Sequence, residues 1–450
     1  MNIDGKKISI IGAVRSGIGA ANLAKRRGGI PFVSDAASET TLAQNIQALK
    51  DVGIEYETGG HSARVYDCDF MVVSPGVPSD AKVILNAKEK GIKILSELEF
   101  ASRFCEGTIV GITGTNGKTT TTTALDFVLK QAGRKSYSAG NIGLAFSEIA
   151  DKMKKDEIVS LEISSFQLDF ISSFRPKYSV ILNITPDHLD RYENDFQKYI
   201  DSKIKIASNQ KEDDYFIYWN EDEFINANKN NLSVEEFPFT IEKNLPKGIY
   251  VENGEIVFAL NGNKETVCTT SDIRLKGKHN LMNLLAVAAI AKLIGLTNEE
   301  IKNGLAEFPG VEHRLEFVRK LNGVTFINDS KATNVESVWY ALQSFENPLI
   351  LILGGKDKGN DYSRIKELVA ERVKKIIAIG SSANKISEFF EGVVPVDVQL
   401  TMEDAVESGY QSAEEGDVVL LSPACASFDM FDNYEHRGEV FKKIVTGLAK

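Results

Sequence analysis

The stretch "GITGTNGKTT", residues 111–120, has the residue types of a loop that binds phosphate. It departs from the common pattern G-x-x-x-x-G-K-[ST], which requires a glycine where Ile112 stands. The flanking sequence still fits, because the apolar run 108–113 predicts a strand before the loop and a helical pattern follows it. Lys118 can pair with the β- and γ-phosphates of a nucleotide, and Thr119 can reach a magnesium ion. We therefore expect ATP or GTP here, in preference to a surface turn with a solvated lysine.

Two further residues stand where such a site needs metal ligands, directly after strand-like runs. A magnesium–phosphate site draws acids from the carboxyl ends of neighbouring strands. Glu162 ends the run "EIVSLE" and is predicted as a magnesium ligand. His188 follows the next apolar run, in "ILNITPDHLDRY". A lone histidine is more often an ordinary surface or core residue, so spacing alone leaves its role open.

A second glycine-rich segment, residues 9–29, has the order strand, glycine turn, helix. Gly12, Gly17 and Gly19 resemble a dinucleotide-binding fingerprint, although the fingerprint requires glycine where Val14 stands. Asp35 ends the next predicted strand, where an acid in such folds holds a ribose hydroxyl. We predict a bound nucleotide of some kind at this helix N-terminus, and NAD is disfavoured.

The whole chain alternates short aliphatic runs with helical patterns, which predicts an α/β fold of parallel sheets with helices on both faces. Changes of pattern near 97–108 and at Pro309-Gly310 predict three domains, 1–98, 99–310 and 311–450. Alternating runs between 210 and 278, with Asn253-Gly254, predict hairpins in a smaller β region of the middle domain. The apolar segment near residue 290 predicts a buried amphipathic helix. The predicted strands are 7–12, 108–113, 157–162, 178–184, 349–355, 375–380 and 417–423.

The composition excludes several classes of protein. The 450 residues carry a formal net charge of −11, which argues against a general nucleic-acid binder. The four cysteines are scattered without a C-x-x-C pair, so we expect neither disulfides nor a zinc site, and a cytoplasmic location. The N-terminus lacks the pattern of a signal peptide, and no apolar run has the length of a membrane helix.

These motifs together resemble the Mur ligase family, the ATP-dependent amide-forming enzymes of peptidoglycan precursor synthesis. "TGTNGKTT" is similar to that family's phosphate loop, in which a glycine stands at position 114, and the resemblance covers essentially the whole chain. It implies an N-terminal Rossmann-like domain for a UDP-sugar, a central ATPase and a C-terminal Rossmann-like domain for the incoming amino acid. Further matching blocks are "GNIG" (140–143), "LEISSFQL" (161–168), "NITPDHLDRY" (183–192), "GKHNLMN" (277–283) and "EHR" (312–314).

Two C-terminal blocks resemble those of the family's D-glutamate-adding members. They are "NDSKATN" (328–334) and "SPACASFDMFDNYEHRG" (422–438). The resemblance therefore implies a ligase that joins D-glutamate to UDP-N-acetylmuramoyl-L-alanine through an acyl phosphate. It implies ATP as co-substrate, two magnesium ions with manganese as a substitute, no NAD, and a monomer.

The resemblance also implies roles for individual residues. His188 matches a metal ligand, and Lys203 matches a lysine that carbon dioxide carbamylates, although on spacing alone Lys203 would be an ordinary helix-surface lysine. The implied catalytic and metal-binding residues are Lys118, Thr119, Glu162, His188 and Lys203. The other residues implied around ATP are Gly114, Thr115, Asn116, Gly117, Thr120, Asn141, Asn280, Asn283, Arg314 and Asp329. The residues implied for the UDP-substrate are Ser16, Asp35 and Gly76, and those for D-glutamate are Thr333, Lys358, Ser427 and the main chain at Tyr434.

Two points follow from these implied positions. Arg314 and Asp329 lie in the predicted C-terminal domain, so ligand binding is expected to close the domains about a hinge near Pro309. Val14 stands where relatives commonly carry glycine, which leaves the path of the first glycine loop open.

Three alternatives stay open at this stage. A sibling ligase would add L-alanine, a diamino acid, or glutamate to folate. A nicotinamide oxidoreductase would use residues 9–35 but leave Gly114–Thr120 without a role. A regulatory GTPase would need an N-K-x-D block to read the base, and none follows the central strands.

Overall fold

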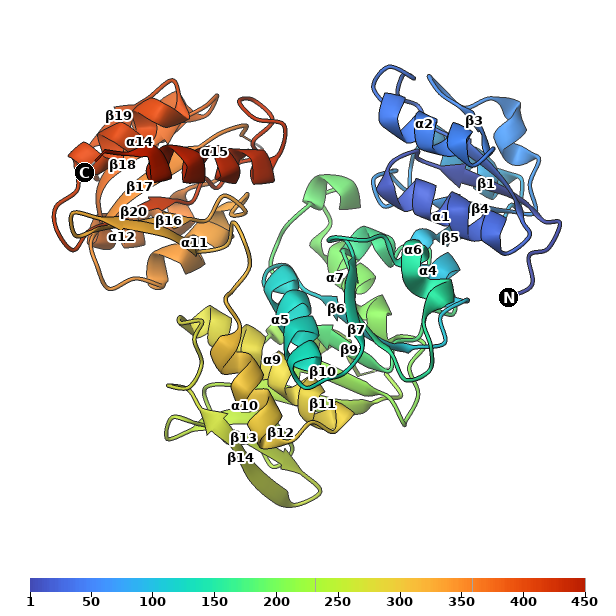
Figure 1. Ribbon diagram of the computed structural model, residues 1–450, viewed down its shortest axis with the longest axis horizontal. Helices are drawn as coiled ribbons and strands as arrows, with labels where there is room; N and C mark the ends of the chain where they lie inside the picture. The colour runs from blue at the N-terminus through green and yellow to red at the C-terminus, as the bar shows by residue number, and fades with distance from the viewer. Residues whose placement is uncertain (231, 358, 450) are drawn as a thin grey trace. The chain divides into compact units, whose positions relative to one another are not determined.

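The computed structural model describes residues 1–230, 232–357 and 359–449 (Figure 1). Over these residues the strands form three sheets dominated by parallel pairs, which confirms the predicted α/β fold with three domains. The contacts divide the chain into two compact units, Met1–Arg274 with Met282–Phe308, and Leu275–Leu281 with Pro309–Lys450. The residue boundaries predicted for the three domains stay a prediction.

The first sheet has the strand order β3-β2-β1-β4-β5, and every neighbouring pair is parallel. Ile10 packs into one core and the next residue, Ile11, into another on the opposite face, which explains the continuous apolar run. The strands are β1 (Lys7–Ile11), β2 (Ile30–Ser34), β3 (Glu55–Glu57), β4 (Phe70–Val73) and β5 (Ile94–Ser96). The helices are α1 (Arg15–Arg26), α2 (Ala43–Asp51), α3 (Lys82–Glu89) and α4 (Glu97–Ser102).

The central sheet has the order β14-β13-β12-β11-β10-β9-β6-β8-β7. Its strands are β6 (Thr108–Thr113), β7 (Ser136–Gly140), β8 (Ile158–Glu162), β9 (Tyr178–Ile181), β10 (Tyr215–Trp219), β11 (Glu235–Thr240), β12 (Gly248–Glu252), β13 (Glu255–Leu260) and β14 (Asn263–Thr269). Its helices are α5 (Lys118–Gln131), α6 (Phe146–Ile149), α7 (Phe196–Ile204), α8 (Glu223–Asn228), α9 (Lys278–Ile294) and α10 (Asn298–Glu307).

The predicted hairpin region is only partly confirmed. β12 and β13 are antiparallel around Asn253 and Gly254, whose φ angles of 51° and 80° suit a tight hairpin turn. The run "YFIYWN", however, forms β10, which is parallel to both β9 and β11. The β region therefore continues the central sheet, in which β9, β10, β11 and β12 are parallel neighbours and only β13 and β14 add antiparallel pairs.

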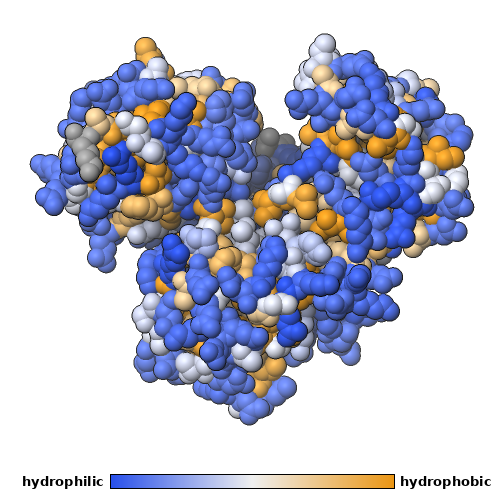
Figure 2. All heavy atoms as spheres, in the orientation of Figure 1, coloured by the Kyte–Doolittle hydropathy of each residue, from blue (hydrophilic) through white to orange (hydrophobic). Residues whose placement is uncertain are grey.

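The apolar segment near residue 290 is a buried helix, as predicted, but it is not amphipathic. Each residue from Leu284 to Ala291 in α9 is fully buried, so the helix is enclosed on all sides over two turns. In the described part of the chain, no helix is both long and apolar enough to cross a membrane. On the face shown in Figure 2, hydrophilic residues predominate and apolar ones are scattered.

The third sheet has the order β15-β16-β20-β17-β18-β19, with β15 and β16 antiparallel and the other pairs parallel. Leu351 and Ile352 of β17 enter cores on opposite faces, which again explains an unbroken apolar run. The strands are β15 (Glu316–Leu321), β16 (Val324–Asn328), β17 (Leu349–Gly354), β18 (Val373–Ile379), β19 (Val396–Val398) and β20 (Val418–Leu421). The helices are α11 (Val335–Gln343), α12 (Ser363–Arg372), α13 (Ala383–Phe389), α14 (Met402–Gln411) and α15 (Tyr434–Gly447).

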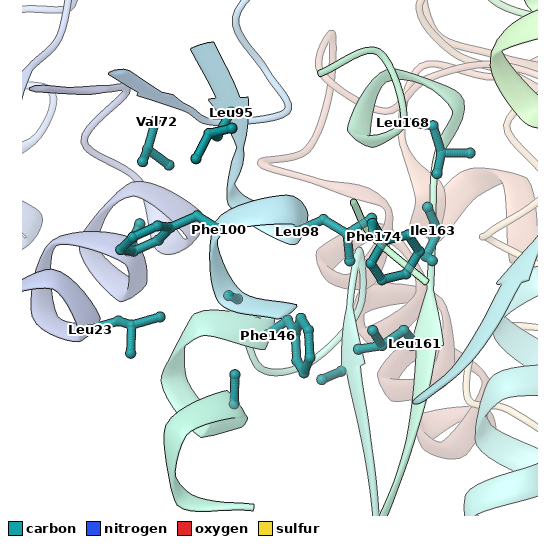
Figure 3. Close-up of a cluster of buried hydrophobic side chains, with 14 of the residues drawn as sticks. Leu23, Val72, Leu95, Leu98, Phe100, Phe146, Leu161, Ile163, Leu168 and Phe174 are labelled. Carbon is teal, nitrogen blue, oxygen red and sulfur yellow. The ribbon is translucent and has the colours of Figure 1, made fainter. Parts of the chain in front are cut away.

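Helix α4 joins the first sheet to the central sheet through one shared core. Figure 3 shows Phe100 on the side of Val72 and Leu23, whereas Leu98 of the same helix lies toward Phe174 and Ile163. All six side chains are at most 1% exposed. The change of pattern predicted near residues 97–108 thus begins in a helix whose side chains pack into the core, and not in an exposed linker.

A buried carboxylate holds the same connection by hydrogen bonds. Glu99 of α4 accepts the backbone N–H groups of Ser172, Ser173 and Phe174 at 2.9, 2.9 and 2.7 Å. Arg103 pairs with it at 2.6 Å. Burial alone would raise the pKa of Glu99, but the bonds from Ser173, the neighbouring amides and Arg103 lower it to about 2.

We predict that Glu99→Ala lowers the free energy of unfolding by about 3 kcal/mol, because three amides and a guanidinium lose their buried acceptor. The depressed pKa means that this stabilisation is complete above the ordinary value of 4.5 and is lost as the pH falls toward 2. Urea unfolding between pH 7 and pH 2.5 measures both effects. Glu106→Ala is the control, because Glu106 is exposed. Equal unfolding midpoints for the two variants at pH 7 would contradict the prediction.

Candidate active site

The phosphate loop joins β6 to α5 and is held in shape by hydrogen bonds to Asn183. Gly114 and Gly117 have φ angles of 150° and 87°, which side chains rarely tolerate. The backbone carbonyl of Asn183 accepts the N–H of Thr115 at 2.9 Å, and its side-chain oxygen accepts the N–H of Asn116 at 2.8 Å. The turn thus stands at the N-terminus of α5, a favourable place for a phosphate.

Two lysine side chains converge on one backbone oxygen of this loop. Lys118 Nζ and Lys203 Nζ each donate to the carbonyl of Gly114 at 2.9 Å. Lys203 is only 2% exposed. Burial first, and then the positive charge of Lys118, bring the pKa of Lys203 well below its ordinary value, although Asp187 opposes the shift. Lys203 therefore loses its proton more readily than an exposed lysine does, and the neutral amine is the form that can react with carbon dioxide.

Glu162 stands at the carboxyl end of β8 and contacts the first residues of α5. The parallel pairing of β6 with β8 puts Glu162 beside Ile112, one residue short of the strand's end. Thr119 Oγ1 donates to one carboxylate oxygen at 2.6 Å, and Asn141 Nδ2 donates to the other at 2.9 Å. A hydroxyl and a carboxylate side by side are oxygen ligands of the kind magnesium prefers, so these residues fit one ion.

His188 lies in the loop after β9 in a left-handed conformation, with a φ of 52°. Its ring meets the edge of Phe166 at a centroid distance of 5.4 Å, and its Nε2 lies 3.6 Å from a carboxylate oxygen of Asp187. Across residues 1–230, 232–357 and 359–449, no three His, Cys, Asp or Glu side chains are grouped as metal ligands. His188 thus stands beside one carboxylate, and its predicted role as a metal ligand stays a prediction.

A cavity of about 860 Å³ lies at the carboxyl ends of the first sheet. Ser16, Asp35 and Gly76, predicted for the UDP-substrate, all line it, together with Asn141. Asp35 uses one oxygen to accept the N–H of Ala13 at 2.6 Å and the other to accept that of Ala37 at 2.8 Å. The carboxylate therefore shapes the wall of the cavity, in addition to any contact with a ligand.

The structure explains how Val14 is tolerated in the first glycine loop. Val14 has φ and ψ of −105° and −169°, an extended conformation that any residue adopts. The left-handed residue of the loop is Gly12, with a φ of 101°. The loop therefore turns at Gly12 and has no conformational need for glycine at position 14.

Sequence reasoning missed several polar residues that line the same cavity, among them Arg15, His61 and Lys82. Arg15 adjoins the predicted Ser16, so its position could have suggested it. His61 follows Gly59-Gly60 after β3, a turn signal that was not connected to the site. Lys82 begins α3 and had no distinguishing sequence signal.

In the second unit, Asp329 and Arg314 lie close to each other, and their predicted role around ATP stays a prediction. Asp329 is 1% exposed and accepts hydrogen bonds from Ser422 Oγ at 2.8 Å and from the N–H of Leu315 at 3.2 Å. Arg314 Nη1 is 3.8 Å away. Burial raises the pKa of Asp329 to about 6, against the opposing charge of Arg314.

Arg437 is a buried positioning residue that sequence reasoning also missed. It donates to Ser330 Oγ at 2.9 Å, to the carbonyl of Ser330 at 2.7 Å and to that of Cys425 at 3.1 Å. Burial lowers its pKa to about 10. Because these partners belong to both C-terminal blocks, one guanidinium ties "NDSKATN" to "SPACAS". The signal was the arginine within "EHRG".

The remaining predicted residues are placed as follows. Thr120 is buried in α5, and Asn283 packs against Gly117 of the phosphate loop. In the second unit, Ser427 is 2% exposed, and the carbonyl of Tyr434 accepts a hydrogen bond from Ser330 Oγ at 2.8 Å. Asn280 donates to the carbonyl of Lys276 at 2.7 Å, and the N–H of Thr333 donates to that of Lys331 at 2.9 Å. Lys358 lies outside the described residues.

Comparison with known proteins matches three family models along the chain. The MurD N-terminal domain matches residues 7–83, the Mur ligase middle domain residues 112–291, and the Mur ligase glutamate ligase domain residues 313–425. Among solved structures, UDP-N-acetylmuramate-alanine ligase MurC from Thermotoga maritima has a TM-score of 0.61 at 20% identity, covering 98% of this chain and 99% of that one. MurF ligase from the same organism, in complex with ADP, has a TM-score of 0.59 at 18% identity, covering 99% of this chain and 96% of that one. Both share the fold.

Curated relatives are much more similar in sequence. The UDP-N-acetylmuramoylalanine–D-glutamate ligase of Christiangramia forsetii is 46% identical, over 99% of this chain and 100% of that protein. Those of Bacteroides fragilis and Salinibacter ruber are 46% and 42% identical, over 98% of this chain and 100% and 98% of those proteins. The chain therefore belongs to the Mur ligase family, where it groups with the D-glutamate ligases.

Proposed function

We propose that this chain is an ATP-dependent ligase that joins D-glutamate to UDP-N-acetylmuramoyl-L-alanine in peptidoglycan precursor synthesis. The observation that carries the proposal is the convergence of Lys118 and Lys203 on the Gly114 carbonyl, beside the Thr119–Glu162 pair. The proposal is also supported by the relatives named as D-glutamate ligases, which are 42–46% identical to this chain over 98–100% of their own length.

The chemistry explains why cations are needed. In the first step, a carboxylate oxygen of the substrate attacks the γ-phosphorus of ATP, and ADP leaves. Two anions must approach each other, and their repulsion is large where water is excluded. Lys118, at the start of α5, offsets this repulsion at the β- and γ-phosphates.

Glu162 and Thr119 would hold one magnesium ion, and His188 with Lys203 would hold a second. When bound, these ions neutralise charge that develops on the transferring phosphoryl group. Lys203 can contribute an oxygen ligand only after its neutral amine has added carbon dioxide and lost a proton, which forms a carbamate. The low pKa of Lys203 favours the uncharged amine that this addition requires.

In the second step, the neutral amine of D-glutamate attacks the acyl phosphate. The C–N bond forms, phosphate leaves, and the amine loses a proton. We propose that Thr333, Ser427 and the main chain at Tyr434 hold D-glutamate in the second unit, together with Lys358. Arg437 would keep the two blocks that carry these residues in register, because it bonds both.

The first test is phosphate release from ATP and magnesium with UDP-N-acetylmuramoyl-L-alanine present. We expect release with D-glutamate and none with L-glutamate, L-alanine or L-lysine. The control omits the UDP-substrate and should also give none. Release with another amino acid would move the chain to a sibling activity, and release with none of them would refute the proposed ligase.

The second test concerns Lys203. We expect the protein, incubated with ¹³C-bicarbonate, to show a carbamate carbon signal that disappears in Lys203→Arg. That variant should lose at least about a hundredfold in kcat, the size of effect seen when one electrostatic group is removed from an active site. Lys205→Arg, two residues further along, is the matched control and should retain both signal and activity. A carbamate signal that persists in Lys203→Arg would contradict the assignment.

A further inference from the structure

A serine and a glutamate hold the ring of His61 at one end of the cavity. The parallel register of β2 with β3 pairs Ser34 with Glu57. Ser34 Oγ donates to Glu57 Oε1 at 2.7 Å and lies 2.7 Å from His61 Nδ1. The chain can return to Ser34 within four residues because Gly59 and Gly60 adopt φ angles of 75° and 144°.

The number of protons in this cluster fixes the tautomer of His61. A serine hydroxyl has a single proton, and an ionised carboxylate can only accept. Burial alone would raise the pKa of Glu57, but bonds from Ser62 and Ser34 outweigh it and hold the pKa below its usual value, so Glu57 is ionised. Ser34 must therefore give its proton to Glu57, and the contact between Ser34 and His61 requires a proton on Nδ1.

His61 then presents a lone pair at Nε2. Burial lowers the pKa of His61, against the opposing charges of Glu57 and Asp35, so the ring is neutral at pH 7. Within the described part of the chain, the ring's hydrogen bond is the one between Nδ1 and Ser34. Because His61 lines the cavity and Ser34 engages its Nδ1, Nε2 is the ring nitrogen left to accept an N–H or O–H from a ligand.

The position of His61 indicates which part of a ligand it would meet. Asn141 lines the cavity on the side of the phosphate loop, because its amide also binds Glu162. A substrate whose carboxylate is phosphorylated must direct that end toward Asn141. His61 follows β3 and Ala36 follows β2, at the side of the sheet away from β4, so they would meet the opposite end, the nucleobase.

We propose that His61 determines base specificity by accepting a hydrogen bond at Nε2 from the N3–H of uracil in the UDP-substrate. The proposal rests on the proposed function, which supplies the uridine nucleotide. Ser34 and Glu57 are positioning residues, which keep Nε2 unprotonated. Cytosine has an unprotonated acceptor at N3 where uracil has an N–H donor. The lone pair of cytosine N3 would face the lone pair of His61 Nε2, so a cytidine nucleotide would bind more weakly.

Calorimetric titration of the full-length protein with UDP, CDP and N3-methyl-UDP tests this without any need for turnover. We expect UDP to bind at least about tenfold more tightly than either of the other two. Equal affinities for UDP and CDP, or no measurable binding of UDP, would overturn the proposal. Phosphate release with D-glutamate is assayed on the same preparation, so failure of the base specificity is distinguished from failure of the ligase assignment.

Two substitutions separate recognition from folding. Asn in His61→Asn can still donate to Ser34 but has no atom at the position of Nε2, whereas Gln in His61→Gln can place an oxygen near it. We expect His61→Asn to lose the preference for UDP over CDP by weakening UDP alone, with KM for ATP unchanged, and His61→Gln to keep most of the preference. If both variants retain the full preference, or if His61→Asn weakens UDP and CDP equally, the proposal fails.

The tautomer itself can be observed directly. The chain has five histidines, and the ¹⁵N spectrum of His61→Asn identifies the signals of His61 by their absence. We expect a neutral ring with its proton on Nδ1 at pH 7. A proton on Nε2 would remove the acceptor and overturn the proposal, even if His61 contacts the base.

Discussion

The meeting of two lysine side chains at the Gly114 carbonyl is the constraint on which the candidate active site depends. Burial, and then the repulsion between two ammonium groups that share one carbonyl oxygen, bring the pKa of Lys203 well below its ordinary value. Lys118 is the residue proposed to contact the nucleotide phosphates, and Lys203 is the residue proposed to react with carbon dioxide. The glycine loop, the start of α5 and the burial of α7 each contribute to this division between two otherwise equivalent side chains.

The cavity and the phosphate loop must also be held at a fixed distance from each other, and a shared hydrophobic core does this. The cavity belongs to the first sheet and the phosphate loop to the central sheet, yet both lie in one compact unit. Phe100 and Leu98 of α4 pack in opposite directions, and Glu99 between them collects three amides from the central domain. Helix α4 thereby ties the sheet that lines the cavity to the sheet that carries the phosphate loop.

The sequence predicted the fold where local patterns agree with tertiary structure. Continuous apolar runs such as that of β17 are buried on both faces, so the parallel strands were found. Strand β10 was predicted as part of a hairpin, but it is a central strand with parallel neighbours on both sides, because a short aromatic-rich run suits either kind of strand. Helix α9 was misjudged because its apolar residues face protein on every side, which a periodic pattern does not reveal.

The candidate site divides in the same way. Lys118, Thr119 and Glu162 could be found because loop and strand ends predict them, whereas Lys203 depended on resemblance, since its burial arises from helix packing that no local pattern reports. His61 and Arg437 stand at a turn signal and in a matching block, but their hydrogen-bond partners, Ser34 and Ser330, are distant in sequence, so the sequence did not indicate what they contact.

Asn141 carries a consequence for how the two ligands affect each other. Its amide lines the cavity and at the same time donates to Glu162, which Thr119 also contacts. Any movement of the Asn141 side chain when the cavity is filled also changes the surroundings of Glu162, the proposed metal ligand. The coupling free energy between the two sites is reciprocal. A compound that fills the cavity would therefore change the affinity for the nucleotide by the same factor by which the nucleotide changes the affinity for the compound. An inhibitor's potency at this site would then vary with the ATP concentration at which it is measured, without any competition for the same space.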